Sequence, residues 1–157
     1  MIIRNILTEE NKNFIHNEWK SSLDKQNDHQ AKGTFTIRQA DFLHKIHTKV
    51  KKILEEETKL KLKEKFTIIR EYKKGDKLKP HLDNAAPFAI TIVVKKSDDK
   101  ENPLVFYNED STDIIILKEG DGYYFINNDS IFSRSILFDI SNLSYPSYFK
   151  KIKNSNI

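Results

Sequence analysis

The sequence predicts an α+β fold in which two helices back an antiparallel β-sandwich or barrel. Two amphipathic helical patterns fill the first 58 residues, and short runs of β-branched and aromatic residues separated by turns follow from residue 63. Hydrophobic residues make up 38% of the 157, including ten Phe and six Tyr, which is enough to fill a core. We expect a single domain over residues 1–157, with helices at about 8–58, strands at about 63–145 and a frayed tail.

The first helix is predicted to begin after Thr8. The Thr8 side chain can cap the helix, and Glu9 and Glu10 then lie at the positive end of its dipole. Apolar residues recur at three-to-four spacing and predict one buried face, formed by Phe14, Ile15, Trp19 and Leu23. The pattern fades into a polar linker at residues 24–33.

The second helix is predicted over residues 39–58. Its apolar stripe consists of Leu43, Ile46, Val50, Ile53 and Leu54. His44 and His47 are three residues apart on this helix, but no carboxylate or further histidine joins them at a spacing typical of metal sites. We therefore interpret both histidines as surface or packing residues.

Short strands are predicted in the second half of the chain. A short extended piece at residues 34–38 precedes the second helix. The run at 88–94 is continuously β-branched and apolar, which indicates a strand buried on both faces, and Pro80 suggests an edge or an irregular strand. The predicted strands are 66–72, 77–83, 88–94, 104–107, 113–117, 123–126 and 136–140.

Composition and charge exclude several functional classes. The absence of cysteine excludes disulfide frameworks, zinc–thiolate sites and thiol catalysis. No segment is typical of a signal peptide or a membrane span, so we expect a cytoplasmic protein. The net charge is +4, but lysines are interleaved with acids and only four basic residues are arginines, so nucleic-acid binding is not favoured.

One short motif points to metal chemistry. His81 and Asp83 lie two residues apart, and residues at that spacing point to the same side of a strand. An imidazole and a carboxylate aimed at one point are two of the three ligands in the two-His, one-carboxylate face that holds non-haem Fe(II). The question is then where a third ligand lies.

The segment around this motif resembles a known family. Arg70-x-Tyr72, Gly75-Asp76 and His81-x-Asp83, followed by a β-branched strand, are similar to the prolyl 4-hydroxylase-like branch of the Fe(II)/2-oxoglutarate oxygenases. The later sequence Gly120-Asp121-Gly122-Tyr123-Tyr124-Phe125 resembles the Gly-Asp strand start of that family. The resemblance covers roughly residues 1–145. It implies a double-stranded β-helix, a jelly-roll or cupin-like barrel, backed by the two N-terminal helices.

The resemblance also implies a site and its cofactors. His81 and Asp83 would be the first two ligands of Fe(II), and Tyr72 would point into the 2-oxoglutarate pocket. The family places a second His a few residues after the Gly-Asp strand, which corresponds to the neighbourhood of Phe132. No histidine follows His81 anywhere in the chain, so Asp129 or water would have to serve as the third ligand.

The co-substrate site departs from the family in a second way. The family uses an Arg or Lys on the last strand to bind the distal carboxylate of 2-oxoglutarate, but residues 139–146 contain no basic residue. A buried carboxylate without a partner costs several kcal/mol. We therefore consider Lys96 and Arg134 as candidate cations from elsewhere in the barrel.

These features leave three hypotheses open. The favoured one is a degenerate oxygenase that keeps the barrel, has lost hydroxylation and binds a peptide, a small ligand or a partner. The alternative is an active dioxygenase with a rearranged site that hydroxylates a peptide or small molecule. A remote third is a basic sheet that binds nucleic acid through an aromatic platform formed by Tyr123, Tyr124 and Phe125.

Overall fold

The computed structural model describes residues 1–27, 35–72, 88–96, 103–107, 110–126, 131–134 and 142–151. The elements follow in the order β1 (Ile2–Ile3), α1 (Glu9–Ser21), β2 (Gln26–Asn27), β3 (Phe35–Arg38), the 3-10 turn η1 (Asp41–Leu43), α2 (His44–Thr58), β4 (Leu62–Tyr72), β5 (Phe88–Lys95), β6 (Leu104–Tyr107), β7 (Thr112–Ile115), β8 (Gly122–Ile126), β9 (Ile131–Arg134) and β10 (Asn142–Lys151).

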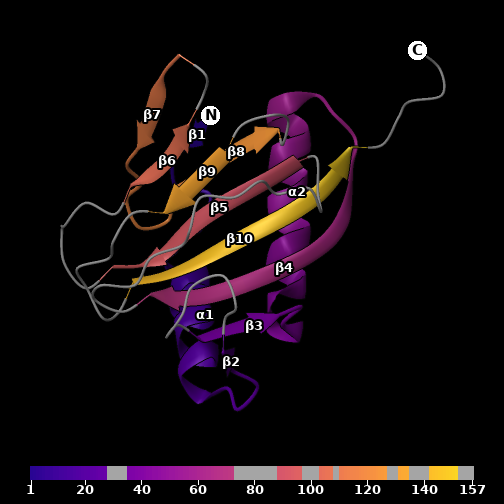
Figure 1. The fold of residues 1–157 in the computed structure, drawn as a ribbon. Helices are drawn as coiled ribbons and strands as arrows, with labels where there is room; N and C mark the ends of the chain where they lie inside the picture. Colours follow the sequence, from indigo (N-terminus) through magenta and orange to yellow (C-terminus); the bar gives the residue numbers. More distant parts are fainter. Residues whose placement is uncertain are drawn as a thin grey trace.

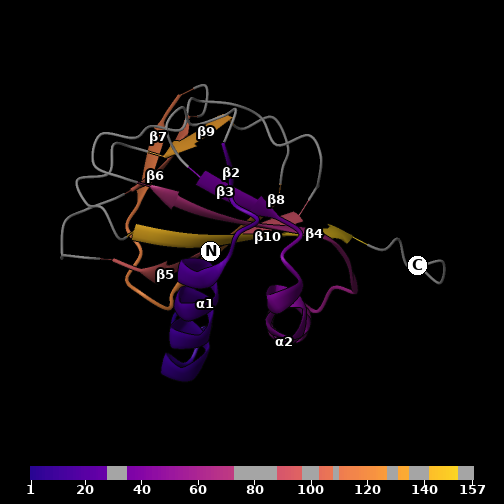
Figure 2. The same cartoon turned by 90° about the horizontal axis from the view of Figure 1, so that it is seen from below.

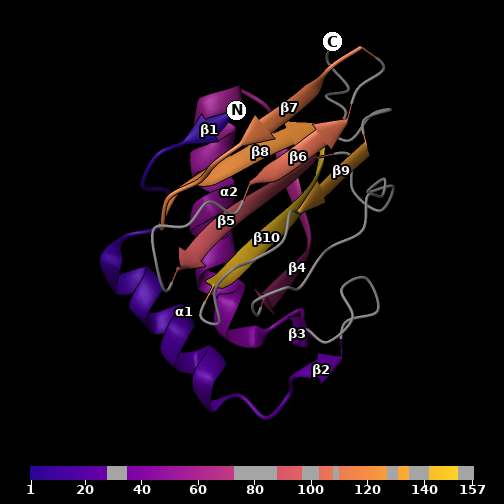
Figure 3. The same ribbon diagram turned by 60° about the vertical axis from the view of Figure 1, so that its left-hand side comes forward.

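The strands of the described residues form two antiparallel sheets. The larger has the order β1-β8-β5-β10-β4-β3-β2, and the smaller has the order β7-β6-β9 (Figure 1). Both helices cover one face of the larger sheet, and the smaller sheet lies over the opposite face (Figure 2). Figure 3 shows β6, β7 and β9 in front of β8, β5 and β10. The predicted α+β arrangement of helices backing antiparallel sheets is therefore confirmed.

The start of helix α1 and its buried face both follow from its sequence. The Thr8 side chain accepts a hydrogen bond from the Asn11 N–H at 3.1 Å, which caps the helix. Ile15 and Trp19 are buried as predicted. Phe14 and Leu23 are not, with exposed fractions of 44% and 98%. Phe14 is adjacent to Ile15 and so points about 100° away around the helix, while Leu23 lies beyond its last residue.

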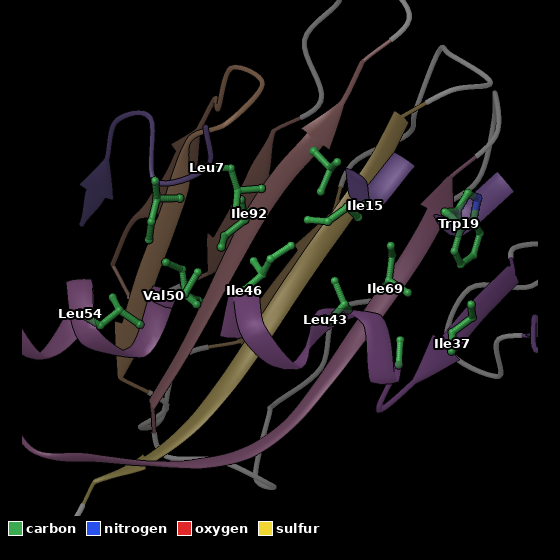
Figure 4. Close-up of a cluster of buried hydrophobic side chains, with 14 of the residues drawn as sticks. Leu7, Ile15, Trp19, Ile37, Leu43, Ile46, Val50, Leu54, Ile69 and Ile92 are labelled. Carbon is green, nitrogen blue, oxygen red and sulfur yellow. The ribbon is translucent and has the colours of Figure 1, made fainter. Parts of the chain in front are cut away.

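Helix α2 supplies the second half of the apolar layer. The predicted stripe is buried at Leu43, Ile46, Val50 and Leu54, and Ile53 packs against the same core. Figure 4 shows Leu43, Ile46, Val50 and Leu54 in the same layer as Ile69 of β4 and Ile92 of β5. Each buried aliphatic side chain contributes roughly 1.5–3 kcal/mol, so this layer is what holds the helices to the sheet.

Strand β5 is buried on both faces because it lies between the two layers. Phe88, Ile90, Ile92 and Val94 pack in the core shared with the helices. Val93, which alternates with them, packs in a second cluster between the two sheets. The smaller sheet thus covers the face of β5 that the helices leave open.

The C-terminal part of the chain differs from its predicted boundaries. Strand β10 continues to Lys151, so the barrel extends beyond residue 145 and residues 149–151 form a strand where a frayed tail was expected. β10 pairs with β4 on one side and β5 on the other, and this double pairing fixes a segment of weak strand propensity. The predicted strands 77–83 and 136–140 lie outside the described residues.

Within the described segments, no helix combines the length and the apolar character needed to cross a bilayer.

Candidate functional site

The predicted metal ligands lie outside the part of the chain that the structure describes. This applies to His81, Asp83 and the candidate third ligand Asp129. The described residues contain no group of three His, Asp or Glu side chains placed to hold a metal ion. The segment that carries His81 and Asp83 connects the end of β4 to the start of β5, the two strands that flank β10.

Tyr72 occupies the barrel interior, at the last residue of β4. Its side chain is 1% exposed and packs with Val93, Leu104, Phe106 and Leu117 in the cluster between the sheets. The resemblance implied that Tyr72 points into the co-substrate pocket, and that role stays a prediction.

Arg70 lies beside Tyr72 on the same face of β4, and the sequence reasoning did not include it as a site residue. Only 5% of Arg70 is exposed. Its Nη1 donates a hydrogen bond to the Tyr72 hydroxyl at 3.1 Å, and its guanidinium carbon lies 5.7 Å from the centre of the Tyr72 ring. A guanidinium and a phenol, both hydrogen-bond donors, are therefore held together inside the barrel.

Lys96 follows the end of β5, at the same end of the sheet as Tyr72. The strand register places Lys96 and Tyr72 at the same end. Lys95 of β5 pairs with Leu143 of β10, and Leu143 also pairs with Glu71 of β4. The Lys96 backbone N–H donates to Glu119 at 2.5 Å, which fixes this strand end. The residue is partly buried.

Strand β9 carries two of the positions that the sequence singled out. Arg134 is the cross-strand partner of Leu104, which packs in the same interior cluster as Tyr72. Phe132, near the slot for the family's second histidine, is the cross-strand partner of Phe106. Phe106 also belongs to the interior cluster, so β9 lies along the interior where a third ligand was expected.

The Gly120-Asp121-Gly122 motif serves as an anchor for the N-terminal strand. Asp121 is 2% exposed and accepts hydrogen bonds from Arg4 Nη1 at 2.6 Å and from the Asn5 N–H at 3.0 Å. Gly122 lies so close to Ile90 that an added Cβ would be 2.9 Å from its Cδ1. The motif therefore has a packing role in addition to its resemblance to the family.

The three aromatic residues of β8 do not form one platform. Tyr123 and Phe125 pack with Phe106 between the sheets, with ring centres 5.3 and 5.2 Å from it. Tyr124 points to the helix layer and stacks on Phe88 at 5.7 Å. Burial, aided by Asp113, raises the pKa of Tyr123, so its hydroxyl stays protonated as a neutral donor.

His44 and His47 line a separate cavity of about 240 Å³ between the start of α2 and β4. His44 is exposed and His47 is 4% exposed. Burial lowers the pKa of His47 to about 4, so it is a neutral packing residue at neutral pH. Neither histidine belongs to a metal-ligating group among the described residues. The other lining residues are Gln39, Ala40, Asp41, Glu64, Lys65 and Thr67.

Arg70 and Tyr72 together offer hydrogen-bond donors of the kind that a carboxylate accepts. A carboxylate accepts hydrogen bonds from a guanidinium and a hydroxyl, and Arg70 and Tyr72 supply both from inside the barrel. For Fe(II), the resemblance implies His81 and Asp83 as ligands. Their imidazole and carboxylate groups are of the kinds that bind Fe(II).

Comparison with known proteins identifies the fold. No family model matches the sequence, and no curated protein matches it. A 2OG-Fe(II) oxygenase family oxidoreductase from Burkholderia pseudomallei superposes with a TM-score of 0.77 at 10% identity, over 99% of this chain and 86% of that one. A prolyl-4-hydroxylase from Pseudomonas putida gives 0.72 at 10% identity, over 97% and 92%.

A third structure gives the same result. The prolyl hydroxylase from Trichoplax adhaerens, in complex with a hypoxia inducible factor peptide fragment, gives a TM-score of 0.76 at 13% identity over 96% of this chain and 83% of that one. The chain thus has the fold of the prolyl-4-hydroxylase-like 2-oxoglutarate oxygenases, and the double-stranded β-helix that the resemblance implied is confirmed.

Proposed function

We propose that this protein, which has the prolyl-4-hydroxylase-like oxygenase fold, has lost hydroxylation and uses the barrel mouth to bind a ligand or partner. The observation that carries the proposal is the position of Phe132. It stands near the slot for the family's second histidine and pairs across the strands with the interior residue Phe106. A phenyl ring offers no lone pair to a metal, and none of residues 131–134 is a histidine.

The loss of a metal ligand has a large expected effect. Replacement of a residue that only hydrogen-bonds to a metal ligand lowers metal affinity or activity about 10–100-fold. The loss of a ligand itself should lower them at least as much. Because Fe(II) sites depend on ligand number and geometry, the pair His81 and Asp83 alone would form a loose site. A barrel of this kind can keep its interior and change its role, since function depends on the site rather than on the fold.

The alternative is an active dioxygenase with a rearranged site, and the burial of Tyr72 in the interior favours it. His81 and Asp83 would hold Fe(II), with Asp129 or water as the third ligand. Tyr72, with Lys96 or Arg134, would hold 2-oxoglutarate. When bound, iron and 2-oxoglutarate supply the oxygen activation that hydroxylates an aliphatic C–H bond of a peptide or small molecule.

Anaerobic titration with Fe(II) and 2-oxoglutarate separates the two functions. The chelated complex has a charge-transfer absorption band, and turnover of 2-oxoglutarate after admission of oxygen reports on activity. We expect neither the band nor turnover. His81→Ala tests the motif directly, and His44→Ala, at an exposed position on α2, is its matched control. A strong band and turnover that His81→Ala abolishes and His44→Ala leaves intact would establish the active enzyme instead.

A further inference from the structure

The smaller sheet ends in an edge strand whose outward side chains are apolar. Strand β7 pairs with β6, and no strand of the described residues pairs with its other edge (Figure 3). Ile114 is 62% exposed, and Ile116, two residues further along the same side of the chain, is also exposed. Tyr107 of β6, the cross-strand partner of Thr112, is exposed beside them. Tyr107, Ile114 and Ile116 together are called the β7 patch.

Other edges of the fold are protected in ways typical of folded proteins. The outer strands of the larger sheet, β1 and β2, are only two residues long. Strand β4 is bordered by β3 only at residues 68–71, and its earlier part carries the exposed residues Lys63 and Lys65. Short strands and lysines both discourage the addition of another chain to an edge. The outward side of β7 has no such lysine, which indicates that this edge is covered in the working protein.

A second copy of β7 fits this edge in one antiparallel register. A two-fold axis through Ile114 places each Ile114 opposite its copy, and Thr112 opposite Ile116 of the second copy. Because Thr112 also pairs with Tyr107 of its own chain, Ile116 of the second copy then lies in one row with Thr112 and Tyr107. All three residues of the β7 patch thus gain a neighbour in a single arrangement.

The charges of the strand allow this register. Asp113 is the one charged residue of β7, and the register places it opposite Ile115 of the second copy. Like charges directly opposite one another destabilise a strand pair, and this register contains no such pair within β7. The other edge of each β7 stays with β6, so the association closes after two copies and does not grow into a fibre.

We propose that the protein forms a two-fold symmetric dimer in which β7 of one copy pairs with β7 of the other, centred on Ile114. The two smaller sheets then join into one continuous sheet. The paired segment is short, so the dimer is weak, with a dissociation constant on the order of 10 µM. The dimer uses the outer side and the edge of the smaller sheet, and it is therefore independent of the proposed function of the barrel mouth.

Sedimentation velocity of the full chain, from about 1 µM to about 1 mM, tests the dimer. We expect the sedimentation coefficient to rise from that of a monomer to that of a dimer. Ile114→Lys sets two like charges opposite each other and should weaken association at least about 10-fold. Leu23→Lys, at an exposed apolar position beyond the end of α1, is the matched control and should leave association unchanged. Circular dichroism shows whether each variant folds.

The register is tested by cross-linking, since the chain contains no cysteine. Opposed residues of an antiparallel pair have Cα atoms about 4.5–5.5 Å apart, which is within reach of a disulfide. Ile114→Cys should therefore give a disulfide-linked dimer on mild oxidation, and Leu23→Cys should give far less. Ile116→Glu should weaken the dimer, and Thr112→Lys in the same chain should restore it, because the two new charges then lie opposite each other across the interface.

Three results would overturn the proposal. The first is a protein that stays monomeric over the whole concentration range, which would leave the edge of β7 to a different partner. The second is a dimer that Ile114→Lys leaves intact or that cross-links equally in Ile114→Cys and Leu23→Cys. The third is assembly beyond two copies. None of these measurements involves metal or 2-oxoglutarate, so failure of the dimer and failure of the proposed function are distinguishable.

Discussion

The indole Nε1 of Trp19 donates a hydrogen bond to Glu71 Oε2 at 3.1 Å, which ties helix α1 to the back of β4. Arg70 and Tyr72 lie on either side of Glu71 and face the opposite way, into the barrel. The packing of the helix layer therefore supports the strand that carries this buried pair.

Replacement of Trp19 by Phe should destabilise the protein by about 2–4 kcal/mol. The change removes the indole donor, leaves the Glu71 carboxylate without that hydrogen bond and opens a small cavity at a fully buried position. The free energy of urea-induced unfolding measures the effect. Phe14→Leu, on the exposed side of the same helix, should stay within about 0.5 kcal/mol of wild type. Equal effects of the two substitutions would contradict this role for Trp19.

Asp121 should matter more for stability than its ion-pair partner Arg4. Asp121→Ala removes an acceptor shared by the Arg4 side chain and the Asn5 N–H, and we expect a loss of about 1–3 kcal/mol. Arg4→Gln should cost less, because the Arg4 side chain is 58% exposed and Asn5 still donates to the carboxylate. Unfolding midpoints in urea give the ranking, and a larger loss for Arg4→Gln would reverse the assignment.

Gly122 should not tolerate a methyl group. An alanine Cβ at this position would be 2.9 Å from Ile90 Cδ1, 3.2 Å from Ile92 Cγ1 and 3.3 Å from Ile6 Cγ2. Overpacking of this kind costs about 1–3 kcal/mol, so Gly122→Ala should lower the thermal midpoint. If the clash is the cause, Ile90→Val in the same chain should recover part of the loss. A Gly122→Ala protein as stable as wild type would show that β8 can move away from β5.

His47 should make the protein less stable in acid. Burial lowers its pKa from 6.5 to about 4 in the folded state, with Glu64 opposing this and His44 and Lys51 adding to it. Below pH 6.5 the unfolded chain therefore binds the proton more readily, and stability falls as the pH drops from about 6.5 to 4. The loss should reach on the order of 2 kcal/mol. Urea unfolding at several pH values measures the slope, which should be shallower in His47→Gln than in the wild-type protein.

The helices and the strand β5 could be predicted because their signals are local. The Thr8 cap and the apolar stripe from Leu43 to Leu54 predict the positions of the two helices directly. The structure contains both the cap and the buried stripe. The face of Arg70 could not be read in the same way. Residues 67–70 of β4 are all buried, so their alternation shows no solvent face to fix the inward direction.

The C-terminal strands were missed for a different reason. β9 is four residues long, and β10 contains Pro146, serines and lysines, which predict a loop or tail. Their strand conformation depends on partners that are distant in sequence, β6 for one and both β4 and β5 for the other. Local sequence signals therefore could not reveal these two strands.

The position of β10 has a consequence for biosynthesis. Strand β10 fills the gap between β4 and β5, which are made much earlier in translation. Until β10 is made, each of these two strands has an open edge where another chain could add. The nascent protein should therefore depend on chaperones late in translation, and premature termination before residue 142 should yield aggregates rather than a smaller folded domain.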